Sequence, residues 1–179
     1  AAAYAPHVLA HLSRAAADAS GRAPLVSEGQ AAYLNALAMY RLSANTRELG
    51  RQRPGETQLY FGLSGRCAVA AGGEEREEIR RGVTLLVRPG APHELVADEA
   101  CELVAASLPS GSWLDGATSP VLLAADDEKL TSQTTAHKSA LLSKRVHFKR
   151  GLVPGLMQAS IARFEPGAIC ELHSHASAT

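Results

Sequence analysis

The chain has 179 residues, which is enough for one domain, or for one domain and part of a second. Hydrophobic residues make up 46% and charged residues 20% of the chain, and this composition excludes wholesale disorder. Because 18 basic residues balance 18 acidic ones and only 4% of the residues are aromatic, neither a basic nor a base-stacking nucleic-acid surface is expected. No apolar run approaches the roughly 18 residues of a membrane-spanning helix, so no membrane span is expected.

A short helix over 7–19 is the first predicted element. Pro6 suits its first turn, and its apolar residues fall on one stripe of a helix. The first residues lack a basic stretch ahead of a long apolar core. We therefore expect a processed chain or a fragment rather than an intact secretory signal.

Short apolar segments punctuated by glycine and proline then run from Leu34 to Ser107, and this texture predicts an all-β antiparallel barrel or sandwich. Ser64-Gly65 and Gly72-Gly73 are expected to form hairpin turns, and the stretch 88–92 a rigid turn. The strands expected in this region cover residues 34–42, 58–63, 66–71, 77–79, 84–88, 94–97 and 101–108.

The polar stretch 126–143 has no clear period and predicts a linker between domains. Strand texture returns at 145–148 and at 156–164. We therefore divide the chain into an N-terminal barrel over 1–125, the linker over 126–143 and the beginning of a second, truncated domain over 144–179.

The three cysteines, Cys67, Cys101 and Cys170, are odd in number, widely spaced and outside any CxxC motif. This usage predicts reduced, buried thiols, and it favours an intracellular or organellar location over a secreted one.

The strongest chemical signal is a pair of histidines near the end of the chain, His173 and His175. In an extended segment, side chains two residues apart point to the same side, so these two imidazoles can share a divalent ion such as Zn, Mn, Fe or Ni. Gly167, five residues and then His-x-His resemble the opening of the first metal-binding motif of the cupins. The glutamate that completes this motif would fall on or just after Thr179, so two imidazoles alone leave the ion short of ligands.

The central region, from Leu34 to Leu108, resembles one entire cupin barrel. Residues 82–93 are similar to the second cupin motif, and residues 58–65 are similar to the tail of the first. The residues that match the second motif are Gly82, Gly90 and His93. Two cupin-like motifs in the expected order imply a jelly-roll-like barrel for this part of the chain.

The ligand positions of this first barrel differ from those of a metal-binding cupin. Gln58 stands where the resemblance places a glutamate ligand, with Glu56 nearby, and Arg51 and Arg53 stand where it places two histidines. Because arginine stays protonated and cannot ligate a cation, we expect no metal in this barrel. One interpretation is a pocket for an anionic small molecule, with the guanidiniums as carboxylate or phosphate clamps. The other is a metal-free barrel in which His93 is structural. The residues of the predicted pocket are Arg51, Arg53, Gln58 and His93.

The resemblance as a whole implies the N-terminal part of a two-cupin, or bicupin, protein. It would bind or act on a small polar metabolite, with a divalent Mn, Fe, Zn or Ni ion at His173 and His175 once the second barrel is complete. Bicupin activities include ureidoglycine aminohydrolase, oxalate decarboxylase, dioxygenases and isomerases, alongside storage proteins without activity. The alternative is therefore a non-catalytic cupin that serves as a structural or assembly subunit. In either case we expect a homo-oligomer or a part of a larger assembly, and the sequence assigns no catalytic residue.

Overall fold

The computed structural model describes residues 19, 21–26, 34–51, 53–71, 76–109, 118–132, 142–148, 152–153 and 158–167. These residues form twelve β-strands and one short 3-10 helix, η2 (Asp127–Lys129). The strands are β1 (Arg22–Val26), β2 (Ala36–Leu42), β3 (Thr46–Leu49), β4 (Glu56–Ser64), β5 (Arg66–Ala71), β6 (Arg76–Arg80), β7 (Val83–Val87), β8 (His93–Ala97), β9 (Cys101–Pro109), β10 (Val121–Asp126), β11 (Leu142–Phe148) and β12 (Ala159–Phe164). The predicted helix over 7–19 lies outside the described residues, except for Ala19. In the described part of the chain no helix is long and apolar enough to cross a membrane.

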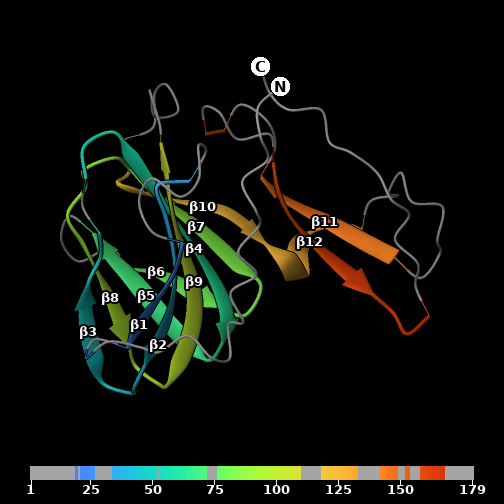
Figure 1. Cartoon of the computed structure of the whole chain (residues 1–179), viewed down its shortest axis with the longest axis horizontal. Coiled ribbons are helices and arrows are strands. Elements are labelled where there is room, and N and C mark those ends of the chain that lie inside the picture. The colour runs from blue at the N-terminus through green and yellow to red at the C-terminus, as the bar shows by residue number, and fades with distance from the viewer. Residues whose placement is uncertain are drawn as a thin grey trace.

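Strands β2 to β9 form a jelly roll, in which the chain is a long hairpin wrapped around a core (Figure 1). The strand pairs are nested: β5 pairs with β6, β4 with β7, β3 with β8 and β2 with β9. Two antiparallel sheets result, with the orders β1-β2-β9-β4-β7-β10 and β3-β8-β5-β6. This arrangement is that of the double-sheet jelly rolls. The predicted all-β antiparallel fold is confirmed, as two facing sheets rather than one continuous barrel.

The main core lies between the two sheets, because each strand alternates its side chains between two faces. Tyr60, Leu85 and Leu103 enter the core from the six-stranded sheet. Val69 and Leu95 enter it from the four-stranded sheet, and all five side chains are fully buried. Burial of a side chain of this size stabilises the fold by roughly 1.5–3 kcal/mol, so this core holds the two sheets together.

The outer face of the six-stranded sheet is apolar as well. Leu86, Ala106 and Leu108 form a second buried cluster there with Phe148 of β11 and with Val153. Among the described strands, β11 pairs with β12 alone, in a separate two-stranded sheet beside the jelly roll (Figure 1). The β11–β12 hairpin is thus attached to the roll through an apolar contact made by β11.

The seven strands predicted between residues 34 and 108 are all present, each within two residues of its expected bounds. The prediction missed β1, β3 and β10. The stretch expected as a linker begins inside β10 and includes η2, while its residues 133–141 lie outside the described part of the chain. The division into two domains remains a prediction.

The Ser64-Gly65 pair is not a hairpin turn, contrary to the prediction. The strands that it joins, β4 and β5, lie in different sheets, so the chain crosses from one sheet to the other here. Gly65 has a φ of 65°, and a Cβ at this position would lie 2.1 Å from the carbonyl oxygen of Ala100. Both the left-handed backbone and this close approach require glycine. Gly72-Gly73 lies outside the described residues, although β5 and β6 on either side of it do pair.

Cys67 and Cys101 are buried, as predicted, and neither forms a disulfide bond within the described part of the chain. The hydrogen bond between the two thiols, together with burial, raises the pKa of Cys67, so this group stays protonated. Cys170 lies outside the described residues.

Candidate functional site

Strand β4 presents Glu56, Gln58 and Tyr60 to the inside of the jelly roll, because side chains two residues apart share a face of a strand. All three are buried. His93 begins β8 in the opposite sheet, and its ring meets Tyr60 across the core. Gln58 therefore lies two positions before Tyr60, the residue of β4 that contacts His93. We call the following six residues the inner cluster: Arg51, Arg53, Glu56, Gln58, Tyr60 and His93.

The two arginines of the inner cluster converge on Glu56. Nε of Arg51 donates to a Glu56 carboxylate oxygen at 3.0 Å, and Nη1 of Arg53 lies 3.8 Å from the other oxygen. The amide of Asn35 donates to the same carboxylate at 2.9 Å. Because the Glu56 side chain is only 7% exposed, these charged partners are what make its burial tolerable. Two guanidiniums and one carboxylate thus lie close together at the start of β4.

His93 uses both of its ring nitrogens inside the protein. Nδ1 lies 2.9 Å from the carbonyl oxygen of Ala91, which can only accept, so Nδ1 carries the proton. Nε2 then accepts a hydrogen bond from the Tyr60 hydroxyl at 2.7 Å. Burial lowers the pKa of His93 and raises that of Tyr60, so both groups are neutral near pH 7. Gly50 leaves room for the ring, because a Cβ there would lie 1.9 Å from Nε2.

Gln58 is almost fully buried, with 2% of its surface exposed. Its Oε1 accepts a hydrogen bond from the hydroxyl of Ser107 at 2.8 Å. Its Nε2 is buried without a hydrogen-bond partner among the described residues. A buried amide donor without a partner costs about 1–3 kcal/mol, so this atom is a ready donor to a bound acceptor oxygen.

Sequence reasoning missed Tyr60, Ser107 and Asn35 as partners of the predicted residues. The alternation of β4 was a usable signal for Tyr60, which lies two positions after Gln58. Ser107 and Asn35 reach the site only because β9 lies between β2 and β4, and nothing near Gln58 in the sequence indicates that pairing.

The chemistry of the inner cluster does not fit a metal ion. The nitrogen of His93 that a metal would need accepts from Tyr60, and two guanidiniums lie nearby. The described residues contain no group of three or more His, Cys, Asp or Glu side chains that could hold an ion. His173 and His175 lie outside the described residues, although the turn ahead of them is present, with a φ of 84° at Gly167.

The lowered pKa of His93 makes the fold sensitive to acid. Because the unfolded chain binds a proton near pH 6.5 and the folded one at a lower pH, stability is full above pH 6.5 and is lost as the pH falls below it. We expect a slope of up to about 1.4 kcal/mol per pH unit from this group. Urea unfolding between pH 7.5 and 5 measures it. The slope should become smaller in a His93→Gln variant, and an unchanged slope would contradict the assignment.

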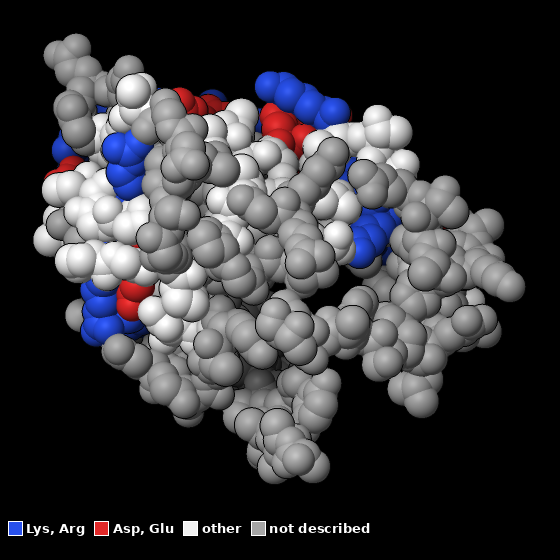
Figure 2. All heavy atoms as spheres, turned by 90° about the horizontal axis from the view of Figure 1, so that it is seen from above, with Lys and Arg blue, Asp and Glu red and all other residues white. Residues whose placement is uncertain are grey.

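On the face of the molecule in Figure 2, the charged side chains of the described residues are not gathered in one place. On the face in Figure 2, lysines and arginines lie in separate spots among the described residues, and several have acidic side chains beside them. Two ion pairs at the surface are Arg47–Glu94 at 3.2 Å, which is exposed, and Arg41–Glu102 at 3.3 Å, which is partly buried. Pairs of this type contribute at most about 1 kcal/mol each.

No protein-family model matches the sequence, and no curated protein matches it. Among solved structures, a Pseudomonas aeruginosa protein described provisionally as glyoxylate induced matches 92% of this chain and 71% of its own, with a TM-score of 0.60 and 15% identity. A cupin 2 conserved barrel domain protein from Salinispora arenicola matches 49% of this chain and 73% of its own, with a TM-score of 0.41 and 17% identity. A cupin superfamily protein from Desulfitobacterium hafniense matches 50% of this chain and 76% of its own, with a TM-score of 0.43 and 11% identity. At these identities the likeness concerns the fold alone. Together with the nested eight-strand order of its two sheets, the likeness to the Pseudomonas aeruginosa protein shows that the described part of this chain is a double-sheet jelly roll.

Proposed function

We propose that this chain is the N-terminal part of a two-cupin protein that binds or acts on a small polar metabolite. The double-sheet jelly roll of the described residues and the cupin-like opening at Gly167, His173 and His175 support this proposal. The two histidines would hold a divalent Mn, Fe, Zn or Ni ion, since imidazole suits these metals. Such an ion supplies Lewis-acid or redox chemistry when it is bound.

In the jelly roll itself, the inner cluster is proposed to bind a small monoanion such as a carboxylate. The observation that carries this proposal is the buried Nε2 of Gln58, which has no partner among the described residues. Arg51 and Arg53 place two guanidinium groups beside Glu56, and guanidinium groups are well suited to bind a carboxylate. Neutral His93 adds no further charge. The residues present therefore bind and orient a ligand through hydrogen bonds rather than through a metal.

Calorimetric titration of the full chain with glycolate and with its neutral amide tests the monoanion site. We expect glycolate to bind more tightly than the amide. The Gln58→Leu variant should weaken glycolate binding at least about tenfold, because a hydrogen bond to a charged group is worth about 1.5–3 kcal/mol. A Gln58→Glu variant keeps the shape but repels the anion, so it should also lose binding. Equal affinity in all three proteins would contradict the proposal.

The alternative, a structural subunit without activity, rests on the change of ligands in the jelly roll. Both ring nitrogens of His93 are used internally, and arginines stand at the two positions where cupins place histidines. Metal analysis of the longest available form of the protein separates the two proposals. A stoichiometric transition metal that is lost in a His173→Ala, His175→Ala variant supports the enzyme, whereas its absence supports a structural subunit within an oligomer or larger assembly.

A further inference from the structure

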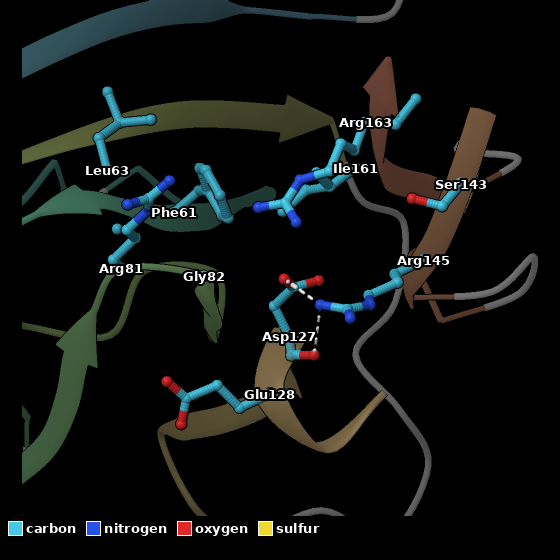
Figure 3. Close-up of a pocket in the computed structure, with 12 residues that line it drawn as sticks. Phe61, Leu63, Arg81, Gly82, Asp127, Glu128, Ser143, Arg145, Ile161 and Arg163 are labelled. Atoms are coloured by element: carbon cyan, nitrogen blue, oxygen red, sulfur yellow. Dashed lines mark hydrogen bonds and ion pairs between the residues drawn. The ribbon is translucent and has the colours of Figure 1, made fainter. Parts of the chain in front are cut away.

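A hollow lies outside the jelly roll, between the outer side of the six-stranded sheet and the β11–β12 hairpin. Its volume is about 610 Å³, which is in the range of sites for small molecules. Its walls come from residues 61–63 of β4, the β6–β7 turn, η2 and the two strands of the hairpin (Figure 3). We call this hollow the outer groove. It shares no residue with the inner cluster.

Backbone contacts at two glycines build one wall of the outer groove. The amide of Gly82 donates to the carbonyl oxygen of Gly62 at 3.0 Å, and the amide of Asp127 donates to the carbonyl oxygen of Gly82 at 2.9 Å. Gly82 has a φ of 83°, and a Cβ there would lie 2.8 Å from the Cβ of Asp127. The β6–β7 turn can therefore lie directly against β4 and η2, which fixes the side chains around it.

The opposite wall is fixed by bonds from β11 to Asp127. Nη1 of Arg145 donates to Oδ2 of Asp127 at 2.7 Å, and Nε2 of His147 lies 3.3 Å from Oδ1. The other ring nitrogen of His147 hydrogen-bonds to the hydroxyl of Thr84 on β7, and the His147 ring packs edge-on against Phe61. These contacts hold the hairpin in place and occupy both oxygens of Asp127.

The charges around the outer groove do not balance. Asp127 is paired with Arg145. Glu128 lies 3.1 Å from Arg80, which it shares with the closer Asp126 at 2.7 Å. Arg81 and Arg163, in contrast, line the groove and form no ion pair with any other described residue. Figure 3 shows both guanidinium groups extending toward the hollow, with the Phe61 ring between them. Two positive charges are thus available to a ligand in the groove.

We propose that the outer groove binds a small dianion, either a phosphate monoester or a dicarboxylate. Each guanidinium presents a planar fork of donors that matches two oxygens of a phosphate or a carboxylate. Two such forks from separate elements, Arg81 after β6 and Arg163 on β12, favour two negative charges over one. Phe61 and Ile161 offer an apolar surface to the carbon part of the ligand. The volume suits a metabolite rather than a macromolecule.

Calorimetric titration of the full chain at low ionic strength, with inorganic phosphate, with succinate and with acetate, tests this site. We expect phosphate or succinate to bind at least tenfold more tightly than acetate. Arg81→Gln and Arg163→Gln should each weaken dianion binding at least tenfold, since each removes one fork. The amide NMR signals of Gly62 and Gly82 should shift on binding, which a distant site would not produce. Binding of phosphate alone identifies a phosphate ester as the ligand, and binding of succinate alone identifies a dicarboxylate.

The matched control is Arg76→Gln. Arg76 is also exposed and forms no ion pair with another described residue, but it lies at the far end of β6 from Arg81. It should change dianion affinity less than twofold. The proposal is overturned if neither dianion binds, or if Arg76→Gln weakens binding as much as the groove variants do. Binding at the inner cluster is measured separately, by titration with a monoanion and with the Gln58 variants. The proposal for the outer groove and the proposal for the inner cluster can therefore fail independently.

Discussion

Replacing Gly65 with alanine is expected to lower the free energy of unfolding by about 3 kcal/mol. The left-handed backbone at Gly65 costs an alanine roughly 1–2 kcal/mol. The new Cβ would also lie 2.1 Å from the oxygen of Ala100 and 2.8 Å from the Cα of Cys101. Both are backbone atoms at the start of β9, so strand and crossover must move apart, and overpacking of this kind costs about 1–3 kcal/mol. Urea unfolding followed by circular dichroism measures the loss.

Gly55 provides the matched control for this substitution. Its φ is 77°, close to that of Gly65, but a Cβ there would meet no atom within 4 Å. Gly55→Ala should therefore cost only the backbone part, about 1 kcal/mol. Equal losses at the two positions would show that the contact between the crossover and β9 contributes nothing.

The Asp127→Ala variant is expected to release the β11–β12 hairpin from the jelly roll. Arg145 and His147 both lose the carboxylate on η2, although Arg145 keeps its hydrogen bond to the carbonyl oxygen of residue 127 at 3.2 Å. The His147 ring is nearly fully buried. A buried polar group without a partner costs about 1–3 kcal/mol, and because Arg145 is partly exposed we expect a loss of about 2 kcal/mol in total. Native-state hydrogen exchange measures the release of the hairpin: the amides of β11 should exchange faster, and the exchange of the amides of β4 should be unchanged.

Asp98→Ala is the control for the loss of a carboxylate. Asp98 is exposed between β8 and β9 and makes no hydrogen bond or ion pair with other described residues. Its removal should change stability by less than about 0.5 kcal/mol. If β11 exchanges no faster in Asp127→Ala than in Asp98→Ala, the hairpin is held by the contacts of Phe148 and Val153 instead.

Sequence reasoning identified the strands in which the pattern of apolar residues matches the pattern of buried side chains. β5, β7 and β9 carry continuous or alternating apolar residues and are buried in the structure. β3 (Thr46–Leu49) is four residues long, with every second residue exposed, and β1 contains Pro24 at the edge of its sheet. Edge strands of this kind form because they pair with an adjacent strand. The local sequence pattern does not indicate which segment that partner is.

The candidate site was predictable in part for a similar reason. The motif spacing identified His93, which contacts Tyr60, and Gln58, which lies two positions before Tyr60 on β4. It could not show that Tyr60 takes the free nitrogen of His93, because that bond joins strands from opposite sheets. The outer groove was missed entirely, because Arg81, Asp127 and Arg163 come together only when the hairpin is in place.

The nested pairing of the strands also governs how this molecule can fold. β5 and β6 form a local hairpin, whereas β2 and β9 pair Ala36 with Ser107 across almost the whole roll. Each outer pair must close a longer loop than the pair inside it, and closing long loops slows folding. The β5–β6 hairpin is therefore the natural starting point, and the ends of the roll join last. Until they do, the apolar edges of β2 and β9 are open to pairing with another chain, so aggregation during refolding should increase with protein concentration.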